Sequence, residues 1–310
     1  DIFKREQPGA HVDVLVRDKV YSRVPVSVTW ELDRSIVVSV GGSQGMDPPD
    51  VGTVAEVAAR WDITLRTEGG ASWGESELYL IDTAMALLTE AERACIREVP
   101  LVISDADPQG LPGTIGVYNF STAARPDIIF YTDNIDQAWT SFLGSTGQPT
   151  PFTVHLILHE IGHAIGDTAW RRGWETMNPQ RLRYSEVSQA AIAATGGRQE
   201  ALRDHPALAE ELRAAHDALV AIGWSKELED ASWEARLEGG QPVATWAAEM
   251  GDRWRPTAYG SSDDIEGFAE FFALAHTDPA AMRRSDPDIV GWFESGTHLS
   301  CEPMPLPEVP

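Results

Sequence analysis

The stretch VHLILHEIGHAIGD, Val154 to Asp167, places three histidines at intervals of four residues among apolar side chains. His155, His159 and His163 would therefore lie along one face of a single α-helix. A proline shortly before the stretch suits a first helical turn, and the glycine near its end suits a helix terminus. Such a row of imidazoles on an apolar helix indicates either a metal site or buried histidines that are satisfied by hydrogen bonds.

The segment HEIGH within this stretch matches the pattern H-E-x-x-H. In that pattern both histidines bind Zn²⁺, and the glutamate acts as general base toward the water at the metal. We therefore predict that His159 and His163 are zinc ligands and that Glu160 is the base. The alternative, a core helix with satisfied histidines, fits His155 best.

The composition limits the partners of the chain. The 310 residues carry a formal charge of −24 and include only three lysines. Phosphate backbones and anionic membrane surfaces would repel such a chain, so we expect neither a nucleic-acid partner nor membrane insertion. Basic peptides are better candidates for a partner or substrate, although the acidic residues are explained equally well by a role in solubility.

Two features bear on where the protein works. The N-terminal residues DIFKREQPGA are not a signal peptide, but the chain does not begin with methionine, which is compatible with a leader removed upstream. We expect a secreted or exported protein. Cys95 and Cys301 could form one disulfide in an oxidising compartment or remain two free thiols.

Hydrophobic periodicity predicts a mixed α+β chain. Residues 11–40 alternate in short β-branched runs that are typical of strands, and helices are predicted at 54–61 and 75–96. Three strand-like pieces, LVIS, TIGVYNF and DIIFYTD, then lead into the histidine-rich helix. An exposed edge strand there could hold an extended peptide. Beyond residue 166 the chain is mainly helical, with predicted helices near 198–222 and 263–276.

A catalytic zinc usually has three protein ligands, so a third side chain must come from elsewhere. In metzincins it is a histidine ten residues after the first, but that position holds Ala169. In gluzincins it is a glutamate on a downstream helix, followed four residues later by an acid that orients a ligand histidine. The stretch YGSSDDIEGFAEFFALAH contains Glu266 and Glu270 at that spacing, on an apolar helix where unpaired carboxylates would be costly. The spacing does not say which of the two binds metal.

These two blocks, HEIGHAIGD and YGSSDDIEGFAEFFALAH, resemble the catalytic domain of anthrax toxin lethal factor and its relatives, a gluzincin family. The resemblance implies that His159, His163 and Glu266 bind zinc and that Glu160 is the base. It also implies that Tyr259 polarises the scissile carbonyl or protonates the leaving amine, and that Glu270 orients a ligand histidine. It covers the two blocks and, weakly, the preceding strands and the segment DPDIVGWF.

The resemblance implies a two-lobed zincin fold, with a small sheet on the N-terminal side, the H-E-x-x-H helix, and a mainly helical C-terminal lobe. We expect a β-rich region of unclear role at 1–70 and a metallopeptidase domain at 71–310. Within that domain we expect a helical insertion at about 167–256 and an irregular, proline-rich tail at 301–310.

The expected function is that of a zinc-dependent endopeptidase, secreted or toxin-like, that hydrolyses peptide bonds. Two other functions stay open. One is a non-proteolytic domain that binds a metal or a partner within a toxin or secretion assembly. The other is a protease lobe whose main role is structural within such an assembly.

Overall fold

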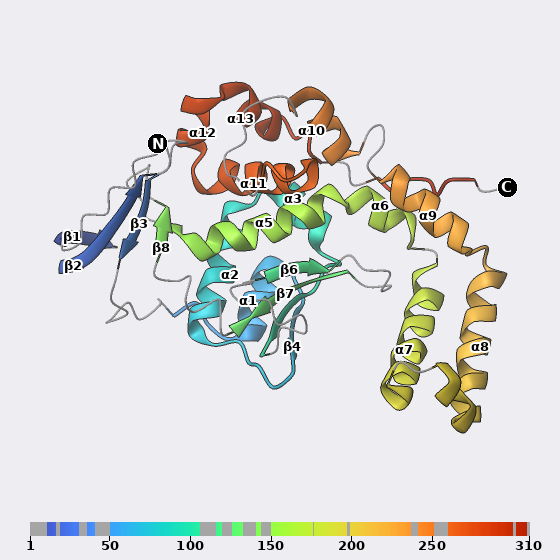
Figure 1. Cartoon of the computed structure of the whole chain (residues 1–310). Coiled ribbons are helices and arrows are strands. Elements are labelled where there is room, and N and C mark those ends of the chain that lie inside the picture. Colours follow the sequence, from blue (N-terminus) through green and yellow to red (C-terminus); the bar gives the residue numbers. More distant parts are fainter. Residues whose placement is uncertain are drawn as a thin grey trace.

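The computed structural model describes residues 11–16, 19–30, 36–40, 50–105, 116–119, 126–132, 141–143, 150–175, 177–196, 199–236, 241–250, 260–299 and 302–308. Figure 1 shows the arrangement of these elements, with α5 crossing the centre of the molecule. Tyr259 and Cys301, both singled out in the sequence, lie outside the described residues.

The first sheet has the strand order β1-β2-β3-β8-β9, with all neighbours antiparallel. Its first three strands are β1 (His11–Val16), β2 (Lys19–Trp30) and β3 (Ile36–Val40), which confirms the strands predicted from the alternating pattern. The last two are β8 (Ser141–Leu143) and β9 (Thr150–Pro151). Because β9 ends at the residue before α5, this sheet is joined directly to the histidine-bearing helix.

The second sheet has the order β4-β5-β7-β6. The strands β4 (Leu65–Glu68), β5 (Leu101–Ser104) and β7 (Asp127–Tyr131) run parallel, whereas β6 (Gly116–Asn119) pairs antiparallel with β7 at the edge. The predicted strands at LVIS, TIGVYNF and DIIFYTD are therefore confirmed. The short, polar β4 was not predicted, because its four residues LRTE show neither alternation nor an apolar run.

The helix predicted at 75–96 is two helices, α2 (Glu75–Leu87) and α3 (Glu90–Ile96). Thr89 starts the second helix. Its hydroxyl accepts a hydrogen bond from the backbone N–H of Glu92, and the Glu92 side chain bonds back to the backbone of Thr89. This reciprocal cap satisfies two amide groups at the helix start, so it favours a break that the apolar periodicity alone did not reveal.

The main core includes residues that precede position 70. Helix α1 (Val54–Trp61) forms where predicted, and its Val57 is fully buried together with Ile63 and residues of α2, α5 and α11. Because β4 pairs with β5, residues 54–68 belong structurally to the same unit as the histidine-bearing helix.

Helix α5 (Phe152–Gly166) carries the three histidines, and α11 (Asp264–Thr277) carries both glutamates. Both helices form close to where they were predicted. A Cβ on Gly162 would lie 3.0 Å from Cα and 3.3 Å from the carbonyl oxygen of Ala269. The missing side chain therefore lets the two backbones come close, which brings the histidines of α5 and the glutamates of α11 into contact.

Helices follow α5 in the described part of residues 167–250, and two of them, α7 and α8, lie side by side and project from the rest of the molecule (Figure 1). The predicted amphipathic helix at 198–222 is a 3₁₀ turn followed by α8, which starts at Pro206. The last helix of this segment returns to the main core, because its Val243 and Trp246 are buried there. The elements are α6 (Thr168–Gly173), α7 (Asn178–Thr195), the 3₁₀ helix (Gln199–Asp204), α8 (Pro206–Ala221), α9 (Lys226–Ala235) and α10 (Pro242–Met250).

Two short helices complete the C-terminal part, α12 (Pro279–Ser285) and α13 (Pro287–Glu294), and residues 302–308 form neither helix nor strand. Met304 in this last segment is buried against Trp170 and Trp174, and its backbone N–H donates to the carbonyl of Ala169 at 2.8 Å.

Cys95, on α3, is disulfide-bonded. Its expected partner, Cys301, lies outside the described residues, so the pairing of the two stays a prediction.

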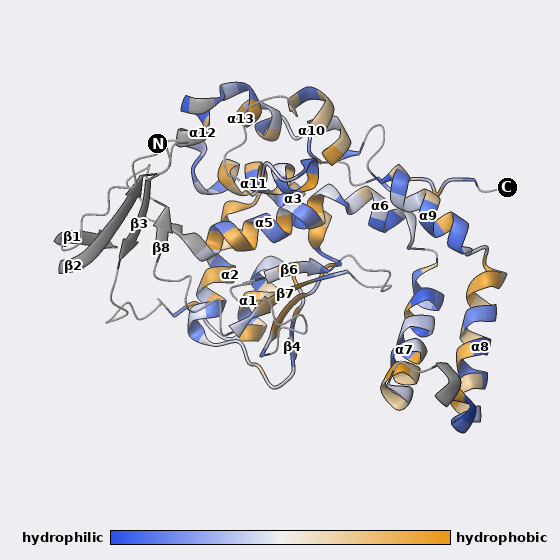
Figure 2. Cartoon of the chain, in the orientation of Figure 1, coloured by the Kyte–Doolittle hydropathy of each residue, from blue (hydrophilic) through white to orange (hydrophobic). Residues whose placement is uncertain are grey.

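The chain is thus an α+β protein in which helices predominate, as the sequence indicated. Figure 2 shows much of α5 and α11 in the colours of apolar residues, whereas α8 and α9 alternate apolar and hydrophilic positions. None of the helices among the described residues has the length and hydrophobicity needed to cross a membrane.

Candidate metal centre

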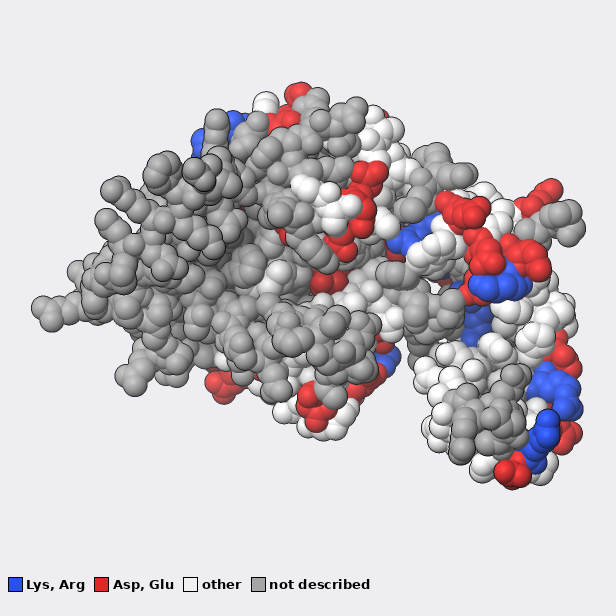
Figure 3. All heavy atoms as spheres, viewed as in Figure 1, with Lys and Arg blue, Asp and Glu red and all other residues white. Residues whose placement is uncertain are grey.

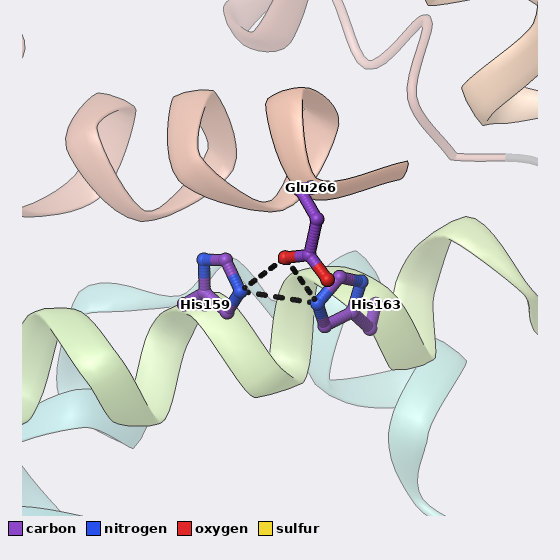
Figure 4. A group of neighbouring side chains, drawn as sticks. All are labelled: His159, His163 and Glu266. Carbon is purple, nitrogen blue, oxygen red and sulfur yellow. Dashed lines mark hydrogen bonds and ion pairs between the residues drawn. The ribbon is translucent and has the colours of Figure 1, made fainter. Parts of the chain in front are cut away.

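Three side chains from α5 and α11 meet at one point (Figure 4). His159 and His163 point up from α5, and Glu266 points down from the first turn of α11. The Nε2 atoms of the two histidines are 3.0 Å apart. Glu266 Oε2 lies 3.0 Å from Nε2 of His159 and 3.3 Å from Nε2 of His163. The three potential ligand atoms therefore form a nearly regular triangle.

The size and chemistry of this triangle fit a zinc ion. Nitrogen and oxygen ligands at about 2.0–2.1 Å from a tetrahedral zinc lie about 3.3 Å from one another, close to the three distances observed. Two imidazoles and one carboxylate are also a common donor set for catalytic zinc, and they leave one position for water. Among the described residues, this is the only group of three or more His, Cys, Asp or Glu side chains near enough to share an ion.

The carboxylate and the histidines of the triangle shift one another's pKa values. Burial raises the pKa of Glu266, but hydrogen bonds from His159 and His163 outweigh it and hold the pKa well below its ordinary value. For His159 burial lowers the pKa, while the hydrogen bond to Glu266 and the charges of Glu160 and Glu270 raise it above the ordinary value. The negative charge gathered here favours a cation, either a proton or a metal ion.

Asp263 caps the N-terminus of helix α11. The Asp263 side chain accepts a hydrogen bond from the backbone N–H of Glu266 at 2.9 Å, which caps the helix. This cap fixes the turn that presents Glu266 to α5. The sequence left the choice between Glu266 and Glu270 to the family resemblance, and the structure brings Glu266 into the triangle.

Glu160 follows His159 on α5 and is half-buried outside the triangle. Its Oε2 accepts the backbone N–H of Tyr118 at 2.6 Å, so the edge strand β6 is tied to the predicted base. The ring of Tyr118 stacks on that of His163, with centroids 6.5 Å apart and planes 14° from parallel. Tyr118 of the edge strand thus interacts with the predicted base and with one of the three candidate ligands.

Tyr118 is a site residue that the sequence analysis missed. Burial raises the pKa of its phenol above the ordinary value, and the charged groups that act on the phenol include those of Arg171 and Asp167. The sequence TIGVYNF indicated an edge strand next to the active-site helix, but nothing in it distinguishes this tyrosine from an ordinary core aromatic. The role of Tyr118 depends on how β6 lies against α5, which only the fold reveals.

His155 and Glu270 form a second pair one turn along the same two helices. His155 Nε2 lies 3.0 Å from Glu270 Oε2, and His155 Nδ1 lies 3.4 Å from the hydroxyl of Thr277. The other carboxylate oxygen of Glu270 is 3.8 Å from Nδ1 of His159. Burial raises the pKa of Glu270, but the hydrogen bond and charge of His155 and the charge of His159 lower it below the ordinary value. His155 is therefore a buried, hydrogen-bonded histidine that stands outside the triangle.

Comparison of the chain with protein-family models, curated proteins and solved structures found no match. The assignment of a function therefore relies on the chemistry of the site and on the two sequence motifs.

Proposed function

We propose that the protein is a zinc-dependent endopeptidase of the gluzincin type. The observation that carries the proposal is the triangle of His159, His163 and Glu266 with Glu160 beside it. A structural zinc site usually has four protein ligands, whereas three ligands with an open position and an adjacent carboxylate are what a hydrolase requires.

In this proposal His159, His163 and Glu266 hold the zinc. A zinc ion bound there supplies Lewis acidity, which lowers the pKa of water and polarises the scissile carbonyl. Glu160 accepts the proton of the attacking water and passes it to the departing amide nitrogen. Since its Oε2 is engaged by the Tyr118 N–H, we assign this proton transfer to Oε1.

The position of β6 supports a peptide substrate. This strand lies at the edge of its sheet and runs antiparallel to β7. Tyr118 on β6 holds Glu160, so a peptide that lies along this edge would place its backbone next to the base. A small-molecule hydrolase would have no need of an extended edge at this place.

The two-lobed zincin architecture and kinship with the lethal factor family belong to the same proposal. They are supported by the order of the elements: a small sheet with an antiparallel edge strand, the H-E-x-x-H helix, and a later helix that presents Glu266. The role of Tyr259 stays a prediction, since it lies outside the described residues.

The proposed substrates carry Lys or Arg near the scissile bond, because the chain has a formal charge of −24. On the face shown in Figure 3, most of the visible Lys and Arg side chains lie over α6 to α9, away from the centre of the molecule. We also propose that the protein is exported, which the disulfide at Cys95 supports because disulfides persist mainly in oxidising compartments.

The experiment is to profile a peptide library with the purified chain, with and without a chelator and added zinc. We expect cleavage that the chelator abolishes and zinc restores, with cut sites enriched in Lys or Arg and rates that fall as salt rises. If the folded, zinc-loaded chain cleaves no peptide, it is a metal-binding or partner-binding domain instead. Cleavage without basic enrichment would remove only the substrate preference.

A further inference from the structure

Helices α5 and α11 form two successive His–Glu pairs, only one of which consists of candidate ligands. The His155–Glu270 pair and the His159–Glu266 pair each have an N–O distance of 3.0 Å. The members of the two pairs are four residues apart on each helix, so the second pair repeats the first one turn away. Glu270 also approaches the first pair, because its second oxygen lies 3.8 Å from Nδ1 of His159.

The His155–Glu270 pair is more deeply buried than the ligand triangle. The side chains of His155 and Glu270 are 4% and 7% exposed, whereas that of Glu266 is 21% exposed. Water therefore cannot readily replace either partner of the His155–Glu270 pair. An ionised carboxylate can only accept hydrogen bonds, so His155 must donate its Nε2 proton to Glu270.

The His155 bond takes one of the two carboxylate oxygens of Glu270. The oxygen that remains, Oε1, is the one that faces Nδ1 of His159. A ligand histidine binds metal better when its second ring nitrogen faces an acceptor, because the acceptor fixes the orientation and tautomer of the ring. The orientation of Glu270 thus determines whether His159 meets such an acceptor.

We propose that His155 is a positioning residue for the metal centre: it holds Glu270 so that the free carboxylate oxygen orients the ligand His159. The inference rests on the proposed zinc site, and it gives the third histidine of the row a role at the centre without making it a ligand. It also explains why a polar ring is kept on an otherwise apolar turn of α5.

The test is the zinc affinity of four variants, measured by competition with a chromophoric chelator and without reference to peptide cleavage. His155→Leu removes the donor, His155→Gln keeps an N–H in its place, and Glu270→Gln removes the ionised carboxylate. The fourth variant combines His155→Leu with Glu270→Gln. We expect His155→Leu and Glu270→Gln each to weaken zinc binding by about 10- to 100-fold, the usual cost of losing the partner of a ligand histidine.

Because His155 acts on the metal centre only through Glu270, we expect the double variant to bind zinc no more weakly than the weaker-binding single variant. His155→Gln should retain more affinity than His155→Leu. The matched control is His298→Leu. His298 is equally buried and its Nε2 lies 2.8 Å from the carboxylate of Glu92, away from the triangle. This control should lower stability and leave zinc affinity unchanged.

Wild-type affinity in His155→Leu, simple additivity in the double variant, or an equal loss in His298→Leu would overturn the inference. If His155→Leu does not fold, imidazole NMR of the wild-type protein decides. The expected result is a protonated Nε2 on His155 both with and without zinc, and a bare Nε2 contradicts it. Failure of the wild-type chain to bind zinc at all would instead refute the proposed function, and the inference with it.

Discussion

The helix pairs α5–α11 and α7–α8 have similar lengths but differ in how far their interacting polar side chains are buried. Between α5 and α11 the polar partners are buried: the side chain of His155 is 4% exposed and that of His159 is 5% exposed. Between α7 and α8, by contrast, Arg183 and Glu211 form an ion pair on the surface, with side chains 56% and 46% exposed. Apolar side chains are exposed on the second pair too, with Ile192 at 57% and Val220 at 46%.

The comparison shows that the same residue types have different consequences in the two places. Removing the partner of a buried carboxylate lowers the free energy of unfolding several times more than removing the partner of an exposed one, because water does not replace the lost interaction. Exposed ion pairs typically contribute about 0–1 kcal/mol. Substitutions of the buried polar pairs of α5 and α11 should therefore be severe, whereas substitutions of exposed polar side chains on α7 and α8 should be nearly silent.

The largest contrast should come from one chemical change made in both places. Glu160→Gln removes the proposed base, and we expect turnover of peptides to fall by about 10²- to 10⁴-fold while zinc content is unchanged. Glu211→Gln makes the same change on α8 and should leave turnover unaltered. Initial rates with matched zinc loading measure both. Substantial activity in Glu160→Gln would remove this residue from the mechanism.

A second contrast tests the close approach of the helices. Gly162→Val would push a branched side chain toward Ala269, whose Cα is 3.0 Å from the nearest possible Cβ. We expect a loss of about 1–3 kcal/mol in the free energy of unfolding, together with weaker zinc binding. Ala193→Val introduces the same side chain on the exposed end of α7 and should cost under about 1 kcal/mol. Urea unfolding curves compare the two, and equal losses would contradict the contrast.

A further prediction concerns acid stability. Burial raises the pKa of Glu92, but hydrogen bonds from His276 and His298 lower it well below its ordinary value. A carboxyl group with a depressed folded-state pKa stabilises the fold above its unfolded pKa, about 4.3, and loses that contribution as pH falls below it. One proton changes stability by at most about 1.4 kcal/mol per pH unit.

Glu92→Gln should therefore be less stable than wild type at pH 7 and show a shallower loss between about pH 4.3 and pH 3. Unfolding free energies at several pH values test this. A slope identical to that of the wild-type protein would show that Glu92 does not titrate with folding.

Sequence patterns predicted the two central helices well because their signals are local. The spacing of His159 and His163 on one apolar segment, and of Glu266 and Glu270 on another, follows from helical periodicity. The break before α3 was missed although it also has a local signal, since Thr89 and Glu92 match a capping box. There the apolar periodicity continued through the break and hid it.

The remaining features depend on which segments meet in space. Glu270 pairs with His155, which is 115 residues away, and Tyr118 bonds to Glu160 across 42 residues. No local pattern encodes such pairs. The parallel pairing of β4 with β5 was likewise invisible, because four residues with two charged side chains resemble a loop until a neighbouring strand is known.

The central claim is that His159, His163 and Glu266 hold one catalytic zinc. The most direct measurement is the zinc-to-protein ratio of purified, folded wild-type chain, Glu266→Ala and Glu270→Ala after dialysis against zinc-free buffer. We predict about one zinc per wild-type chain, none in Glu266→Ala, and a Glu270→Ala that still binds zinc with about 10- to 100-fold lower affinity. A wild-type chain without zinc, or a fully loaded Glu266→Ala beside a metal-free Glu270→Ala, would contradict the account.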